Sequence, residues 1–131
     1  SILQAVKTYT RNRVICVFGC GGDRDSGKRP LMGETAGKIA SFSIITTDNP
    51  RTEKPEDIIK DIEEGIKKTK GKYTVIVDRR EAIKEAIKMM GKGDIVVLAG
   101  KGHEKYQEIG KEKKTFDERE IIAEVLEELK K

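Results

Sequence analysis

The sequence predicts an α/β domain of Rossmann-like, three-layer architecture, and three observations support this prediction. Four short apolar runs rich in β-branched residues occupy residues 14–18, 42–46, 73–77 and 95–99. Between these runs, apolar side chains recur at helical spacing. The length of 131 residues suits a single core. Because buried strands that alternate with helices form mainly parallel sheets with right-handed crossovers, helices should cover both faces of the sheet.

Proline and cap residues support the helical segments. Pro30 suits the first turn of a helix. Asp78 followed by Glu81 has the spacing of an N-cap residue and its reciprocal glutamate, and Asp117 with Glu120 repeats that spacing before the last apolar stripe. These signals predict where three of the helices begin.

A β-hairpin is expected near the carboxyl end. Residues 106–109 and 113–116 flank Gly110 and Lys111, a pair suited to a tight turn. At the other end, the apolar positions of residues 2–9 predict one more helix. A helix that opens an alternating α/β chain indicates that a preceding strand lies outside this chain.

Composition argues against several classes of function. Charged residues make up 38% of the sequence, but 27 Lys and Arg oppose 23 Asp and Glu, so no basic stripe indicates a nucleic-acid partner. No apolar run approaches the roughly 20 residues of a membrane-spanning helix, and no signal-peptide core is present at the amino terminus. We therefore expect a cytoplasmic protein with no nucleic-acid or membrane partner.

The cysteines do not suggest a metal site. Cys16 and Cys20 are the only two, and His103 is the only histidine, so a four-ligand zinc site lacks ligands. We expect Cys16 in a buried strand and Cys20 packed in the turn that follows, because cysteine often behaves as a small buried apolar residue.

The segment after the first predicted strand is rich in glycine and cations. In residues 19–30, glycines allow backbone N–H groups to approach an anion, while Arg24, Lys28 and Arg29 supply charge for a phosphate or carboxylate. The spacing around Lys28 does not match a Walker A loop, so a self-sufficient triphosphate site is not expected. Taken alone, this segment could equally be a tight strand-to-helix connection.

Two further loops carry polar side chains after the second and fourth predicted strands. Pro50 stiffens its loop, and Arg51 offers a planar fork for a carboxylate, although an Asx-type turn with a solvated arginine is the alternative. After the fourth strand, Glu104 suits an ammonium group, whereas His103, with no Ser or Cys nucleophile to pair with, is more often structural. Since parallel strands end at one edge, the three loops together suit a zwitterionic amino acid.

Four ordered motifs resemble a known family. They span residues 18–25, 28–33, 48–53 and 99–104, the last followed by a Tyr-Gln pair. Together they are similar to the carboxy-terminal domain of UDP-N-acetylmuramoyl-tripeptide synthetases, which are Mur ligases, over nearly all of the chain. The Asp-Asn-Pro-Arg sequence in the third motif is that family's mark for meso-diaminopimelate rather than lysine.

The resemblance implies roles for these motifs. Whole ligases use ATP and Mg²⁺ to phosphorylate UDP-MurNAc-L-Ala-D-Glu, and the amine of the amino acid then attacks the acyl phosphate. The carboxy-terminal domain carries that amino acid, so no catalytic residue is expected in this chain. Asp23 is expected at the ATP ribose and Lys28 near the nucleotide. The residues expected to bind meso-diaminopimelate are Arg24, Asp48, Asn49, Pro50, Arg51, Gly100 and Glu104.

The resemblance also predicts that residues 1–131 form one domain, with the amino-terminal uridine-nucleotide domain and the central ATPase domain absent. The chain alone should then bind rather than catalyse. A freestanding Rossmann-like module for a nucleotide or an amino acid is the alternative, and an upstream reading frame containing a P-loop would exclude it. A nucleic-acid binder is a second alternative, which binding insensitive to salt would exclude.

Overall fold

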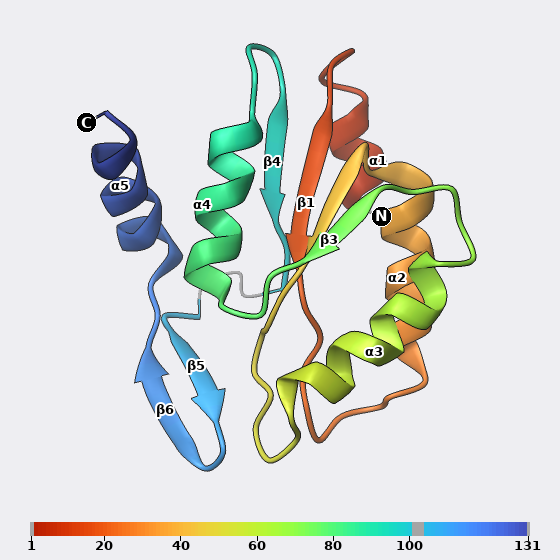
Figure 1. The fold of residues 1–131 in the computed structure, drawn as a ribbon, viewed down its shortest axis with the longest axis vertical. Coiled ribbons are helices and arrows are strands. Elements are labelled where there is room, and N and C mark those ends of the chain that lie inside the picture. Colours follow the sequence, from red (N-terminus) through yellow and green to blue (C-terminus); the bar gives the residue numbers. More distant parts are fainter. Residues whose placement is uncertain (1, 101–103, 131) are drawn as a thin grey trace.

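Four parallel strands form the centre of the fold in the computed structural model, which describes residues 2–100 and 104–130 (Figure 1). The strand order is β3-β2-β1-β4, with all three pairings parallel. These strands are β1 (Val14–Phe18), β2 (Phe42–Ile45), β3 (Tyr73–Val75) and β4 (Ile95–Leu98). The helices are α1 (Ile2–Lys7), α2 (Lys28–Ile39), α3 (Pro55–Ile66), α4 (Arg79–Met89) and α5 (Glu118–Leu129).

Helices cover both faces of the sheet, as predicted (Figure 1). Because successive residues of a strand point to opposite faces, Cys16 and Phe18 of β1 join a core with α1, α2 and α3, whereas Ile15 and Val17 pack against α4. Helix α5 packs against α4, with Val125 fully buried between them. The three-layer, mainly parallel α/β class is confirmed.

Three strands are shorter than the sequence predicts. β2 and β4 each end one residue early, and β3 ends at Val75 rather than at residue 77. Beyond β3, one further backbone bond continues the ladder, from Ile76 N–H to the Ile45 carbonyl (3.0 Å). Thr46 is buried just after β2, and its hydroxyl donates to the Val77 carbonyl (3.2 Å), so a side-chain bond replaces the ladder there.

The predicted helix starts are confirmed with one correction. Pro30 lies in the first turn of α2, and the Asp78 carboxylate caps α4 by accepting from Glu81 N–H (3.0 Å). The Asp117 carboxylate caps α5, but it accepts from Arg119 N–H (3.0 Å) instead of the residue three positions on. Either of these first-turn N–H groups can satisfy an N-cap acceptor.

The predicted hairpin forms a separate two-stranded sheet of β5 (Tyr106–Ile109) and β6 (Glu112–Thr115). β6 begins one residue earlier than expected, because Ile109 pairs with Glu112 across the turn. Gly110 has φ 62°, a conformation that glycine adopts without a steric penalty. A single β-bridge between Arg51 and Ile109 joins the hairpin to the loop after β2.

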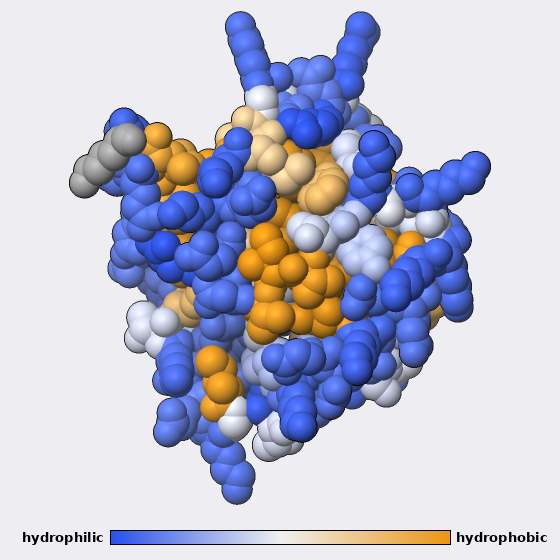
Figure 2. Space-filling model, viewed as in Figure 1, coloured by the Kyte–Doolittle hydropathy of each residue, from blue (hydrophilic) through white to orange (hydrophobic). Residues whose placement is uncertain are grey.

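The surface is mostly charged. Figure 2 shows polar side chains around an apolar patch in the middle of the viewed face, between α3 and α4. β3 is the edge strand on this side, and all of its residues are partly exposed. No helix in residues 2–100 and 104–130 has both the length and the apolar character needed to span a membrane.

Candidate functional site

The loops after β1, β2 and β4 meet at the carboxyl edge of the sheet, and glycines allow the first two to touch. A Cβ at Gly22 would overlap the Pro50 carbonyl, and Gly22 N–H donates to the Asn49 carbonyl (2.8 Å). A Cβ at Gly19 would likewise overlap the Thr46 carbonyl. The glycine-rich segment therefore lets the loop after β1 pack directly against the loop after β2, in addition to making the turn from β1 into α2.

A cavity of about 350 Å³ lies where these loops meet. Four of the sequence-predicted ligand residues line it, namely Arg24, Lys28, Asp48 and Gly100. Gly100 has φ 109°, and a Cβ there would lie 3.7 Å from Asp48 Oδ2. The cavity thus combines two exposed cations and the buried Arg29 with two carboxylates, Asp25 and Asp48, and an open backbone, a set suited to a polar, charged ligand.

Asn49, Arg51 and Glu104 form a second group beside this cavity. Asn49 is buried, and its Nδ2 donates to Glu104 Oε1 (3.1 Å). Two of the predicted ligand residues, from loops 55 positions apart, are therefore in direct contact. Pro50, which precedes Arg51, is also buried.

Arg51 is the link between the two groups. It has φ 52°, a strained value for a residue with a side chain, and its Nη1 donates to the Gly22 carbonyl (3.0 Å). A Cβ on Gly21 would lie 2.9 Å from Arg51 Nη1 and 3.5 Å from Arg24 Cγ, so both arginines flank this glycine. Arg51 is thus fixed to the loop after β1, unlike a solvated arginine on a simple turn.

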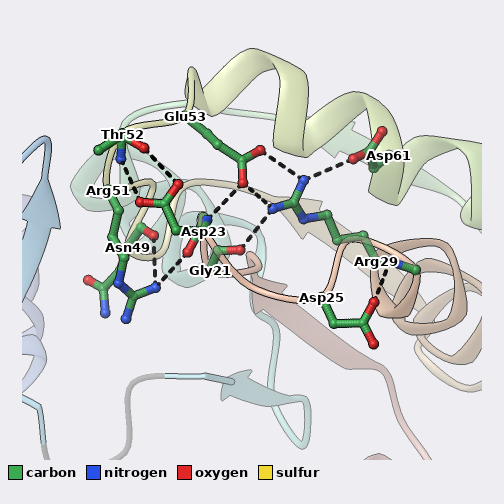
Figure 3. Close-up of polar contacts among 11 residues, drawn as sticks. Gly21, Asp23, Asp25, Arg29, Asn49, Arg51, Thr52, Glu53 and Asp61 are labelled. Atoms are coloured by element: carbon green, nitrogen blue, oxygen red, sulfur yellow. Dashed lines mark hydrogen bonds and ion pairs between the residues drawn. The ribbon is translucent and has the colours of Figure 1, made fainter.

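Asp23 and Arg29 tie the loops together (Figure 3). The Asp23 carboxylate accepts from the Thr52 hydroxyl (2.7 Å) and N–H (3.3 Å), and Asp23 N–H donates to Glu53 Oε1 (2.7 Å). Asp23 is exposed and has φ 54°. Its carboxylate therefore contacts the loop after β2. The expected contact with the ATP ribose stays a prediction.

Arg29 corrects one expectation. The sequence suggested an exposed cation for an anionic ligand, but the side chain is 3% exposed and pairs with Glu53 (2.8 Å) and Asp61 of α3 (2.9 Å). Its Nη2 also donates to the Gly21 carbonyl (3.1 Å), as Figure 3 shows. The arginine hydrogen bond lowers the pKa of Glu53, so this carboxylate stays charged under mildly acidic conditions. Arg29 is a structural tie between two loops and a helix.

Arg79 is a second buried arginine that sequence reasoning did not single out. It begins α4, and its Nη1 and Nη2 donate to the carbonyls of Thr47 (3.3 Å) and Ala99 (3.1 Å), while its Nε pairs with Glu118 (2.9 Å). The ends of β2 and β4 are thereby held to one side chain. The sequence places this arginine directly after the predicted cap Asp78, but it gives no sign of its burial.

The hairpin supplies the remaining contacts. Gln107 Nε2 donates to the Asp48 carbonyl (2.9 Å), and Glu108 pairs with Arg51 Nε (2.7 Å). The Tyr-Gln pair in the sequence pointed to this segment, but nothing there assigned a role to Glu108. His103 lies outside the described residues.

The cysteine expectation is confirmed. Cys16 and Cys20 are free and buried, and Cys20 Sγ lies 3.4 Å from Met32 Sδ. Burial raises the pKa of Cys16 to about 12 and that of Cys20 to about 11, so both are neutral thiols at neutral pH. Within the part of the chain that the structure describes, no group of three or more His, Cys, Asp or Glu residues is placed to hold a metal ion.

Fold and site together define an α/β domain that presents charged loops at the carboxyl edge of a parallel sheet, a common place for ligands in such folds. The chain belongs to the Mur ligase family, since the family model described as "Mur ligase, glutamate ligase domain" matches residues 1–102. The predicted family resemblance is confirmed.

Relatives share the whole of this chain but are much longer. The UDP-N-acetylmuramoyl-L-alanyl-D-glutamate–2,6-diaminopimelate ligase of Caldanaerobacter subterraneus subsp. tengcongensis is 59% identical over 131 residues, which are 100% of this chain and 27% of that protein. The ligase of the same name from Alkaliphilus metalliredigens is 56% identical over 98% of this chain and 26% of its own length. A solved structure of a ligase of this name matches with a TM-score of 0.93 and 45% identity, over 99% of this chain and 27% of that one.

Proposed function

We propose that this chain is the amino-acid recognition domain of an ATP-dependent ligase that adds meso-diaminopimelate to UDP-MurNAc-L-Ala-D-Glu in peptidoglycan synthesis. The names of its relatives support the reaction. Since the chain spans about a quarter of their length, the remaining steps require polypeptide beyond these 131 residues. A cytoplasmic setting, where ATP and the nucleotide-linked precursor are available, is part of the proposal.

The observation that carries this proposal is the fixed position of Arg51. Its backbone is held at φ 52°, and its Nη1 is held by the Gly22 carbonyl, so the guanidinium is oriented before a ligand arrives. A guanidinium pairs with a carboxylate through two parallel hydrogen bonds, which an ammonium group cannot replace. Lysine lacks the distal carboxylate of meso-diaminopimelate, so Arg51 would select between the two amino acids.

The contact between Asn49 and Glu104 complements that cation. Glu104 brings a negative charge to Asn49, two residues before Arg51. The distal end of meso-diaminopimelate carries both an ammonium and a carboxylate. An ammonium on Glu104 and a carboxylate on Arg51 would satisfy both ends of that zwitterion. Asn49 would donate either to Glu104, as it does in the free chain, or to the ligand carboxylate. In this proposal Arg24, Asp48 and Gly100 line the space for the rest of the amino acid.

The proposal also includes contacts with the nucleotide. Lys28 lines the same cavity as Arg24, so it can face a phosphate of ATP. Asp23 accepts two hydrogen bonds from Thr52, which leaves lone pairs for a ribose hydroxyl. Mg²⁺ would be held by residues of the ATPase domain. We therefore expect no substrate-dependent phosphate release from the 131-residue chain with ATP, and such release would contradict the assignment of the chain as a binding domain.

An NMR titration of the ¹⁵N-labelled chain tests the recognition directly. With meso-diaminopimelate, amide shifts should be confined to the loops that contain Arg24, Asn49, Arg51 and Glu104. L-lysine should cause little shift, because it has no carboxylate for Arg51. The variant Arg51→Ala should lose the response, whereas Arg80→Ala, which removes a partly exposed arginine of α4 that pairs with α5, should keep it.

The outcomes separate clearly. Shifts with meso-diaminopimelate alone that depend on Arg51 support the proposal. Equal shifts with lysine, or an Arg51→Ala variant that binds as well as the wild type, contradict it. If the wild-type chain shows no shift at millimolar ligand, the same titration on the longer ligase decides whether the site needs its partner domains, since a site that keeps only one wall loses preorganisation.

A further inference from the structure

The strand β5 of the hairpin is bonded to the loop that carries Arg51. Arg51 N–H donates to the Glu108 carbonyl (3.0 Å), and Gly110 N–H donates to the Arg51 carbonyl (2.6 Å). Glu108 N–H donates to Asn49 Oδ1 (2.9 Å). Two neighbouring ligand residues of the proposed site are therefore held by the same short strand, and Glu108 takes part through both backbone groups.

The side chain of Glu108 adds a third contact, which occupies one edge of the arginine. Glu108 Oε2 lies 2.7 Å from Arg51 Nε, so the two side chains form a close ion pair. Nη1 donates to the Gly22 carbonyl (3.0 Å). Nη1 also donates to the Asn49 carbonyl (3.5 Å). Among the described residues, Nη2 has no assigned acceptor. A ligand carboxylate would thus meet Nη2, at the end of the guanidinium rather than at its Nε side.

We propose that Glu108 is a positioning residue for recognition, which turns the open end of the Arg51 guanidinium toward the amino-acid ligand; this inference rests on the function proposed above. Glu108 does not contact the ligand itself. It blocks side-on pairing at Nε and removes rotational freedom from an arginine side chain, whose ordering would otherwise weaken binding. Both partners are largely buried, with 20% and 24% of their side chains exposed, so solvent competes weakly with the pair.

The variant Glu108→Gln distinguishes a positioning role of Glu108 from a direct contact between the Glu108 carboxylate and the ammonium group of the ligand. Glu108→Gln keeps a side-chain oxygen beside Arg51 Nε but removes the negative charge, whereas Glu108→Ala removes both. Positioning requires only a polar side chain that contacts Arg51 Nε, so the glutamine should restore most of the binding. An ammonium contact would require the charge, so the glutamine and alanine variants should then be equally weak. Glu112→Ala is the matched control, because Glu112 is an exposed glutamate on the other strand of the hairpin.

The experiment combines two NMR readouts on the 131-residue chain. In the free chain, the Arg51 Nε–Hε signal should move in Glu108→Ala and stay near its wild-type position in Glu112→Ala. In titrations with meso-diaminopimelate, Glu108→Ala should raise the Kd by up to about tenfold, because ordering a released arginine side chain on binding costs up to about 1.5 kcal/mol. Glu108→Gln should stay within about threefold of the wild type.

Two results would overturn the inference. Glu108→Ala could bind as tightly as Glu112→Ala, or Glu108→Gln could be as weak as Glu108→Ala. If the wild-type chain does not respond to meso-diaminopimelate, the recognition proposed for the isolated chain fails, while the Arg51 Nε–Hε signal of the free chain still decides the positioning role. An unchanged signal in Glu108→Ala then refutes it, and a displaced signal supports it.

Discussion

Replacing Arg79 by methionine should strongly destabilise the fold, because this guanidinium joins three segments at the carboxyl edge of the sheet. Its side chain is fully buried and pairs with Glu118, which is 12% exposed. It also donates to the carbonyls of Thr47 and Ala99. Methionine fills much of the same volume with apolar atoms, so the variant tests the polar contacts more than the packing.

The magnitude follows from what the substitution leaves behind. A buried carboxylate and two carbonyls would lose their donor, and breaking a buried ion pair by removing one partner costs about 3–5 kcal/mol. The neighbouring Arg80 is the control, since it also pairs with two carboxylates, Glu124 and Glu128, but is 31% exposed. Exposed pairs contribute about 0.2–1 kcal/mol, so Arg80→Met should cost less than about 1 kcal/mol.

Urea unfolding at pH 7, followed by circular dichroism, gives both free energies of unfolding. The reasoning is refuted if Arg79→Met and Arg80→Met differ by less than about 1 kcal/mol. A third variant tests the mechanism, because Arg79→Met combined with Glu118→Gln removes the stranded charge. The double variant should be more stable than the sum of the two single losses indicates.

Two further predictions concern the contacts between the loops. Arg29 lowers the pKa of Glu53 in the folded chain, so the charged Glu53 side chain stabilises the fold. This stabilisation is complete above the usual glutamate pKa of about 4.3, and it is lost as pH falls through the lower pKa that Glu53 has in the folded chain. The difference in unfolding free energy between the wild type and Glu53→Gln should therefore shrink below about pH 4, and urea titrations that show a constant difference would contradict this. Gly22→Ala should cost about 1–3 kcal/mol, because its methyl would overlap the Pro50 carbonyl. Gly91→Ala, with no atom closer than 3.5 Å, is the control, and equal melting temperatures would refute the overlap.

The sequence was sufficient to predict the sheet and the edge that carries the site. Apolar runs separated by helical stripes have few alternative folds, and parallel strands necessarily end at one edge. The cavity accordingly brings together Arg24, Lys28, Asp48 and Gly100 from three separate loops. These features depend on local patterns, which a single sequence contains.

The buried arginines and the hairpin contact could not be predicted in the same way. Arginine is usually exposed, so a pattern of charges gives no sign that Arg29 and Arg79 are enclosed by carboxylates and carbonyls. Likewise, the pairing of Arg51 with Glu108 joins the loop after β2 to strand β5 across 57 positions of sequence, as their residue numbers show. Such pairings arise from tertiary packing, which periodicity does not reveal.

The bonds from the hairpin to Asn49 and Arg51 also bear on the order of folding. They close long stretches of chain, with Asn49 bonded to residues 55 and 59 positions away. Contacts of this kind form late, because the entropy of loop closure is lost before they contribute. The sheet can therefore be complete before the hairpin is bonded to the loop that carries Asn49 and Arg51. In native-state hydrogen exchange, the amide of Arg51 should open at a lower free energy than those of β1, so that binding competence appears only in the last step of folding.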